Sequence, residues 1–329
     1  MNLEERNATF VSTMREKYVI GIDGGGTKSA AILADSSANV LAEVTRGPSN
    51  FQIIGVDQAA EVLFSCAEEC CRRAGRSLAD VDGFVAGLTG AGRVADQERM
   101  KGALEARFRQ LGPIPAGLMI ESDARIALEG AFRGAGGIIL IAGTGSIALG
   151  KTPEGRTFRV GGWGRILGDE GSGYAIGAQG LNCVTRELDH RGKKTLLTKL
   201  VSERFGLKDQ ETIIREIYRN NFEVPSVAPL VIQAAGEHDQ ESERILNRAA
   251  FELTEYVRAL TFELEQATRG PRQKIPLSFI GSLLTEESIF PNIVKHKIEF
   301  SIPQISVVKP QASPAYGAVL MARKLAGVQ

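Results

Sequence analysis

Hydrophobic and small residues near the N-terminus alternate with short polar or glycine-rich segments in a pattern that predicts three consecutive β-strands. The predicted strands are Tyr18–Asp23, Ser29–Ala34 and Val40–Thr45, and Gly24-Gly25-Gly26-Thr27-Lys28 joins the first two. The glycine motif of a Rossmann fold or a P-loop leads directly into a helix. Because small, β-prone residues follow this glycine segment, we expect a turn between antiparallel strands instead.

The same succession of strand, small-residue turn and returning strand recurs in the middle of the chain. Gly137–Ala142 predicts a strand, Gly143-Thr144-Gly145-Ser146 a turn, and Ile147–Gly150 the returning strand, with a further strand at Arg156–Val160. Two such units indicate a duplicated architecture in which each lobe presents one turn to a shared cleft.

Most of the remaining pattern is helical. Apolar spacing predicts helices at Ala59–Arg76, Ala124–Phe132, from Tyr174 onward, through most of Thr195–Gly270 and at Pro314–Ala326, and one more buried strand at Pro276–Ile280. Residues 1–17 are polar and aperiodic, and we expect a flexible N-terminal extension there. We expect an N-terminal lobe of residues 18–132 plus 312–329 and a C-terminal lobe of residues 133–311.

Composition and charge argue against several classes of partner. The 329 residues suit two lobes, and 39 basic residues balance 39 acidic ones, so no net field would recruit a nucleic acid or a membrane. No apolar run approaches the ~20 residues of a membrane-spanning helix, and the first residues lack the apolar stretch of a signal peptide. We therefore expect a cytoplasmic protein with no nucleic-acid or membrane partner.

Four cysteines raise the question of a metal site. Cys66, Cys70 and Cys71 share one predicted helix, and Cys183 stands far from them in the sequence. No nearby histidine or second cysteine pair completes a tetrahedral set. We expect reduced thiols that pack a helix.

The two turns are candidates for phosphate binding. Backbone N–H groups of glycine-rich turns can approach phosphate oxygens closely, and the hydroxyls of Thr27, Thr144 and Ser146 add donors. Asp23, at the end of the first strand, is a candidate for holding Mg²⁺ through water. Either turn alone is also explained as a tight hairpin. The presence of both favours a nucleotide site.

Asp123 stands where a predicted strand gives way to a helix. Aspartate is a favoured N-cap, so capping alone would explain it. A carboxylate at a helix N-terminus also stays ionised and rigid, which suits a general base. The flanking turns favour the base.

The only tryptophan, Trp163, lies among glycines and is followed by Asp169 and Glu170 before a predicted helix. The two acids could be helix caps. Carboxylates also accept hydrogen bonds from sugar hydroxyls, and an aromatic face packs on ring or acetyl carbons. We interpret this segment as part of a sugar site.

Together these segments resemble the N-acetylglucosamine kinase branch of the sugar-kinase/actin superfamily, which also contains the ATPase subunits of benzoyl-CoA reductase. The resemblance covers nearly the whole chain from about Val19. It implies an α/β fold of two ribonuclease-H-like lobes, the actin-like ATPase fold, around a central cleft for ATP and a sugar. It also implies ATP and Mg²⁺ as cofactors, an amino sugar as substrate and a homodimer.

The resemblance also implies roles for individual residues. Asp123 would be the catalytic base that takes the proton of the sugar C6 hydroxyl as it attacks the γ-phosphate. Asp23 would hold the metal. Nucleotide contacts are expected from Gly24, Gly25, Gly26, Thr27, Lys28, Thr144, Ser146, Gly281 and Ser282, and sugar contacts from Asn50, Thr89, Gly90, Asp123, Gly145, Gly162, Trp163 and Asp169.

Three alternatives stay open at this point. The sugar could be glucosamine or N-acetylmuramic acid in place of N-acetylglucosamine. The chain could be an activase-type ATPase of a radical enzyme system, which needs cysteine ligands for a shared [4Fe–4S] cluster, and Cys183 is the only cysteine near the cleft segments. Some sugar-kinase relatives are repressors, but the 17 residues before the first predicted strand are too few for a helix-turn-helix domain.

Overall fold

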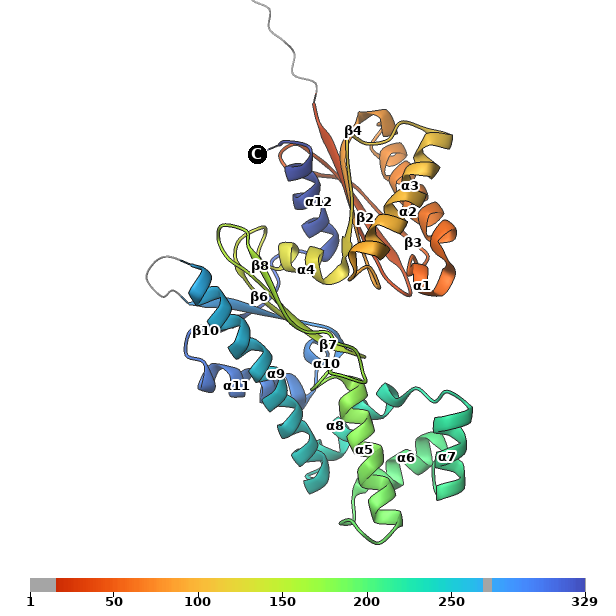
Figure 1. Cartoon of the computed structure of the whole chain (residues 1–329), viewed down its shortest axis with the longest axis vertical. Coiled ribbons are helices and arrows are strands. Elements are labelled where there is room, and N and C mark those ends of the chain that lie inside the picture. Colours follow the sequence, from red (N-terminus) through yellow and green to blue (C-terminus); the bar gives the residue numbers. More distant parts are fainter. Residues whose placement is uncertain (1–15, 269–273, 329) are drawn as a thin grey trace, which may run out of the picture. The chain divides into compact units, whose positions relative to one another are not determined.

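The computed structural model describes residues 16–268 and 274–328, and the chain divides into two compact α/β units (Figure 1). The N-terminal unit comprises Met1–Ile126 and Pro314–Gln329, and the C-terminal unit comprises Ala127–Ser313. Within the described ranges, no helix has both the length and the apolar character needed to cross a membrane.

The N-terminal unit is built on a five-stranded sheet. Its strands are β1 (Tyr18–Gly24), β2 (Ser29–Asp35), β3 (Val40–Arg46), β4 (Val81–Leu88) and β5 (Gly117–Ser122), in the spatial order β3-β2-β1-β4-β5. The first three strands pair antiparallel, and β1, β4 and β5 pair parallel. The glycine segment therefore joins antiparallel strands, as the sequence predicts.

Helices cover both faces of this sheet (Figure 1). One face carries α1 (Phe51–Ile54), α2 (Val56–Arg73), the 3₁₀ turn Leu78–Asp80 and α3 (Val94–Leu111), and the other carries α12 (Pro314–Leu325). Helix α2 ends three residues before the predicted Arg76. Gly75 takes a φ of 63° there, and the N–H of Arg76 bonds back to the Cys71 carbonyl (2.9 Å), which closes the helix.

The C-terminal unit repeats the same sheet topology. Its strands are β6 (Gly137–Ala142), β7 (Ser146–Lys151), β8 (Thr157–Gly161), β9 (Ile275–Ile280) and β10 (Ile305–Val308), in the order β10-β9-β6-β7-β8. The first three strands in the chain again pair antiparallel, β9 pairs parallel with β6, and β10 pairs parallel with β9. The predicted duplication is confirmed, because the two sheets have one connectivity.

The helical region of this unit also follows the prediction. It contains α5 (Gly173–Leu188), α6 (Leu196–Phe205), α7 (Gln210–Arg219), the 3₁₀ turn Val224–Val227, α8 (Ala228–Gly236), α9 (Gln240–Ala267), α10 (Ser282–Thr285) and α11 (Ile289–Ser301). Residues 269 and 270 of the predicted helical stretch lie outside the described residues. Helix α4 (Asp123–Ala131) begins in the N-terminal unit, and its residues from Ala127 onward belong to the C-terminal unit, where Leu128 and Phe132 pack with Ile139.

The three cysteines of α2 are free thiols in the core of the N-terminal unit, as expected from the sequence. Burial raises the pKa of Cys66 to about 11 and that of Cys70 and Cys71 to about 12, so all three stay protonated at neutral pH. Of the predicted extension, residues 1–15 lie outside the described residues. Lys17 is already anchored, since its Nζ donates to the Ala326 carbonyl (2.7 Å).

Candidate active site

The first glycine turn is closed by a hydrogen bond from the N–H of Gly25 to the Lys28 carbonyl (2.9 Å). Gly26, Thr27 and Lys28 are exposed. Within the described residues, the backbone N–H groups of Gly26 and Thr27 have no hydrogen-bond partner. These N–H groups are therefore available to an anion.

Two loops of the N-terminal unit are tied to this turn through its carbonyls. The N–H of Ser49 donates to Gly25 (3.0 Å), and the N–H of Thr89 donates to Gly24 (3.0 Å). The turn is thereby connected to the segments that hold Asn50 and Gly90. The residues predicted for phosphate, metal and sugar in this unit thus belong to one cluster.

Asp123 is not the N-cap of α4. Ser122 is, because its hydroxyl accepts the N–H of Arg125 (3.2 Å), while Asp123 is the first helical residue. The Asp123 carboxylate accepts the Thr89 hydroxyl at Oδ2 (2.8 Å) and the N–H of Ala124 at Oδ1 (2.8 Å). Of the two interpretations that the sequence left open for Asp123, the capping role is therefore taken by Ser122, and the base role stays a prediction.

Asp23 is half-buried at the end of β1, and its pKa is raised to about 6. Burial is the main cause, and the negative charge of Asp123 adds to it, while the Lys28 ammonium acts in the opposite direction. Asp23 is thus a half-buried carboxylate that lies close enough to Asp123 for the two negative charges to interact. Such an excess of negative charge is suited to a cation.

Asn50 and Gly90, two of the predicted sugar contacts, are both hydrogen-bonded to Gln52. Asn50 is buried and caps α1, with its Oδ1 accepting the N–H of Gln52 (3.1 Å). The Gln52 amide donates to the Gly90 carbonyl (3.4 Å), and Gly90 has a φ of 92°. Asn50 therefore has a structural role in addition to the predicted sugar contact.

The second turn, in the C-terminal unit, has the same open character. The N–H of Gly143 donates to the Gly145 carbonyl (2.9 Å), and among the described residues the N–H groups of Thr144 and Gly145 have no partner. The side chain of Thr144 is exposed. Ser146 is different, because its buried hydroxyl donates to the Glu170 carbonyl (2.8 Å).

Asp169 lies directly against this turn. Its Oδ1 accepts the N–H of Ser146 (3.4 Å), and a Cβ placed on Gly145 would stand 3.0 Å from its Oδ2. A side chain at position 145 would therefore push the carboxylate away. The next residue, Glu170, accepts the Tyr256 hydroxyl (2.5 Å), and burial followed by this bond raises the pKa of Tyr256 to about 12.

Trp163 is not a core residue, since 74% of it is exposed. It follows Gly162, whose N–H donates to the Ser146 carbonyl (3.1 Å), so the tryptophan segment is attached to the second turn. Gly281 has a φ of 89° and precedes α10, which begins at Ser282. A Cβ on Gly143 would lie 4.0 Å from the Ser282 hydroxyl, so the predicted adenosine turn also adjoins the second turn.

Sequence reasoning missed Tyr256 and Ser122. Tyr256 lies on α9, 86 residues from its partner Glu170, and no local signal connects them. Ser122 had a signal, since serine before a helix is a favoured cap, but Asp123 beside it is as good a capping type.

Comparison with known proteins places the chain in a family. A curated N-acetylmuramic acid/N-acetylglucosamine kinase of Clostridium acetobutylicum is 35% identical over 310 residues, which cover 93% of this chain and 98% of that protein. An N-acetyl-D-glucosamine kinase of Dictyostelium discoideum is 30% identical over 94% of this chain and 98% of its own length. A crystal structure described as a candidate N-acetylglucosamine kinase from Chromobacterium violaceum has a TM-score of 0.69 and 27% identity, covering 93% of this chain and 98% of that one.

The two sheets have the same connectivity, and each has an open glycine turn between antiparallel strands. This architecture defines an ATPase of the actin-like fold class, with two ribonuclease-H-like lobes. The predicted fold class is confirmed. The chain belongs to the BadF/BadG/BcrA/BcrD ATPase family, whose model matches residues 20–322.

Proposed function

We propose that this sugar kinase transfers the γ-phosphate of ATP to the C6 hydroxyl of an amino sugar, and that N-acetylglucosamine is its preferred substrate. The observation that carries the proposal is the Asp123 carboxylate, which Thr89 and the start of α4 hold in one orientation. The names of the relatives support an amino-sugar kinase over an activase-type ATPase, since those with 30% identity or more over at least 93% of this chain are kinases of N-acetylglucosamine or N-acetylmuramic acid.

In the proposed reaction Asp123 is the general base. Each of its carboxylate oxygens accepts one hydrogen bond within the protein and has a lone pair left for a substrate proton. As the sugar oxygen forms its bond to the γ-phosphorus, the bond from that phosphorus to the ADP oxygen breaks, and the hydroxyl proton passes to Asp123. A positioned base contributes typically 10²–10⁴-fold to such a step.

Asp23 fits the expected magnesium site. Its half-buried carboxylate has a raised pKa, mainly through burial and secondly through the Asp123 charge, so a bound cation would stabilise its ionised form. Bound Mg²⁺ would neutralise charge on the transferring phosphate. Within the chain, Asp23 would hold that ion through water, and Lys28 would add a second positive charge at the turn.

The unpartnered N–H groups of the two turns are the proposed phosphate contacts. Gly26 and Thr27 supply them in the N-terminal unit, and Thr144 and Gly145 supply them in the C-terminal unit. The remaining predicted nucleotide contacts, Gly24, Gly25, Lys28, Ser146, Gly281 and Ser282, complete the proposal. The Ser146 hydroxyl donates to Glu170 and its N–H to Asp169, so a nucleotide contact from Ser146 would replace one of these bonds.

We assign the sugar to Asn50, Thr89, Gly90, Gly145, Gly162, Trp163 and Asp169. An exposed indole attached to the second turn offers a flat apolar face for ring or acetyl carbons. Asp169 offers acceptors for sugar hydroxyls. Glucosamine and N-acetylmuramic acid are the alternative substrates, and a glucosamine kinase of Vibrio cholerae is 31% identical over 57% of this chain.

A substrate screen tests the proposal. Phosphate transfer from ATP is measured for N-acetylglucosamine, glucosamine, N-acetylmuramic acid and glucose, and the phosphorylated carbon is identified by NMR. We expect the highest kcat/KM for N-acetylglucosamine and no transfer to its 6-deoxy analogue. ATP hydrolysis without transfer to any sugar would overturn the kinase assignment. The cytoplasmic location and the homodimer stay predictions, and light scattering of the purified protein tests the second.

A further inference from the structure

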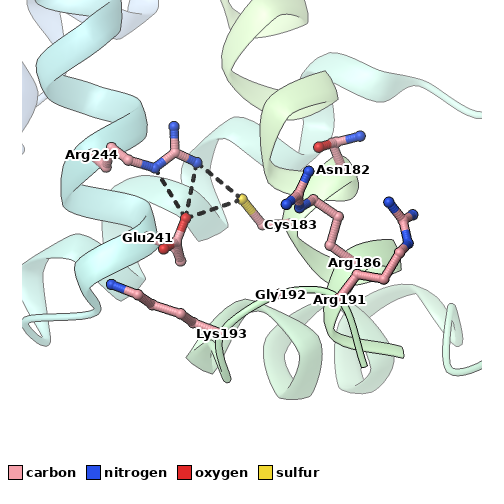
Figure 2. Close-up of a pocket in the computed structure, with 8 residues that line it drawn as sticks. All are labelled: Asn182, Cys183, Arg186, Arg191, Gly192, Lys193, Glu241 and Arg244. Atoms are coloured by element: carbon pink, nitrogen blue, oxygen red, sulfur yellow. Dashed lines mark hydrogen bonds and ion pairs between the residues drawn. The ribbon is translucent and has the colours of Figure 1, made fainter. Parts of the chain in front are cut away.

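A cationic pocket lies in the C-terminal unit, where the end of α5, the loop after it and the first turns of α9 meet (Figure 2). Its volume is about 460 Å³, within the usual size range of small-molecule sites. Four cationic side chains line it, Arg186, Arg191, Lys193 and Arg244, against a single acid, Glu241. None of these residues takes part in the proposed kinase reaction.

Two of the four cations are already neutralised. Arg244 forms a forked ion pair with Glu241, with Nε at 3.0 Å and Nη2 at 2.9 Å from Oε2. Arg191 pairs with Asp189 (2.7 Å). The side chains of Arg186 and Lys193 have no hydrogen bond or ion pair with any part of the chain that the structure describes. The pocket therefore retains about two uncompensated positive charges.

The chain is folded tightly to bring these cations together. The N–H groups of Arg191 and Gly192 both donate to the Arg186 carbonyl (2.8 and 2.9 Å), so the loop returns onto the last turn of α5. A Cβ on Gly192 would lie 2.9 Å from the Arg186 Cβ, so the close approach requires glycine. These bonds also satisfy a carbonyl at the helix C-terminus, where an exposed carbonyl would repel an anion.

The thiol of Cys183 adds no negative charge to the pocket. Burial raises its pKa, and its Sγ accepts a hydrogen bond from Arg244 (3.6 Å) and donates one to Glu241 (3.8 Å). Figure 2 shows Cys183, Glu241 and Arg244 joined in this network. Because Arg244 is engaged in this network and Arg191 is paired with Asp189, Arg186 and Lys193 are the cations of the pocket that remain available to bind a ligand.

We propose that this pocket binds a small phosphate-bearing molecule through Arg186 and Lys193. A phosphate monoester carries about −1.5 to −2 charges at neutral pH, which matches the two uncompensated cations. Arginine offers a planar fork suited to phosphate oxygens, and lysine adds a point charge. The balanced charge of the whole chain favours a small ligand over a nucleic acid.

Calorimetric titration of the full-length protein tests this inference. Inorganic phosphate and glucose 6-phosphate are the two probes, and a non-hydrolysable ATP analogue is present at saturation to occupy the nucleotide site. The test variant is Arg186→Gln/Lys193→Gln. The matched control is Arg219→Gln/Lys208→Gln, which removes the same charge from the same unit, and Arg219, like Arg186, lies in the last turn of its helix.

We expect saturable binding to the wild type and the control, and at least about tenfold weaker binding to the test variant, since a hydrogen bond to a charged group is worth that much or more. Tighter binding of glucose 6-phosphate than of inorganic phosphate would identify an organic ester as the ligand, and equal binding would identify free phosphate. Equal affinity in all three proteins, or no binding to the wild type up to about 10 mM, would overturn the inference. Because the altered side chains are exposed, unfolding midpoints should agree among the three.

Discussion

The hydroxyl of Thr89 donates a hydrogen bond to the carboxylate of Asp123 (Oγ1 to Oδ2, 2.8 Å), which links the residue after β4 to the first residue of α4. Ser122, and not Asp123, caps the helix. A carboxylate that is not needed as a cap, and is held by two donors, is well placed for another role. Substitutions at Ser122 and Asp123 can separate the capping role of the first residue from the proposed base role of the second.

Asp123→Asn should lower kinase turnover by roughly 10²–10⁴-fold, because asparagine cannot take up the proton. Its melting temperature and ATP affinity should stay close to wild type, since the side chain keeps its size and its acceptor oxygen. Ser122→Ala is the matched control. It should lower stability by about 0.5–2 kcal/mol through loss of the cap, with a much smaller effect on turnover. More than about a tenth of wild-type turnover in Asp123→Asn would contradict the base assignment.

Thr89→Val should lower kcat roughly tenfold to a hundredfold, because the carboxylate loses the donor that fixes its direction. Thr89→Ser retains a hydroxyl and should recover most of the loss. Steady-state kinetics separate the two possible causes. A rise in the sugar KM with an unchanged kcat in Thr89→Val would show that Thr89 contributes to sugar binding alone and does not orient Asp123.

The local features of this fold were predictable, and the long-range ones were not. The strand–turn–strand units are local, since β1–β3 lie within Tyr18–Arg46 and β6–β8 within Gly137–Gly161, so both follow from alternation and glycine placement. The end of α2 depends on a single left-handed glycine, Gly75. The Tyr256–Glu170 bond joins distant parts of the chain, and the pattern around either residue contains nothing that specifies the other.

The ion pair between Lys151 and Glu129 is another such long-range contact. Both side chains are only 2% exposed, the Nζ–Oε2 distance is 2.5 Å, and the ammonium also donates to the Gly134 carbonyl (2.7 Å). Lys151→Met should cost about 3–5 kcal/mol of unfolding free energy, because it removes the buried ammonium that pairs with the Glu129 carboxylate. Urea unfolding measures this cost.

The control for that change is Lys199→Met. Lys199 forms an exposed pair with Glu203 at 3.9 Å, and exposed pairs contribute about 0–1 kcal/mol. The two substitutions remove the same charge and add the same side chain. Equal effects on the unfolding free energy would show that burial of the Lys151–Glu129 pair does not determine its contribution.

Trp163→Ala should raise the sugar KM and leave the ATP KM and the melting temperature near wild type. An indole that is 74% exposed contributes little to the packing of the core. Its loss should therefore weaken only the binding of a ligand that packs on it. Trp163→Phe keeps a flat aromatic face and should be intermediate. A fall in melting temperature of several degrees with an unchanged sugar KM would assign Trp163 a structural role.

Asp23→Asn should make the protein more stable at pH 7 while reducing its activity. The pKa of Asp23 is about 6 in the folded state and near 3.8 when unfolded, so the native state binds more protons between these values. Stability due to this group therefore falls as pH rises from about 4 to about 6, and above pH 6 the charged form costs on the order of 1–3 kcal/mol. The asparagine variant does not incur this cost, because its side chain carries no charge. Urea unfolding with EDTA present should show a gain at pH 7 that disappears near pH 4, while kinase assays with magnesium show lost turnover. A variant less stable than wild type at pH 7 would mean that Asp23 already has enough positive charge around it, which would remove the electrostatic reason for a metal there.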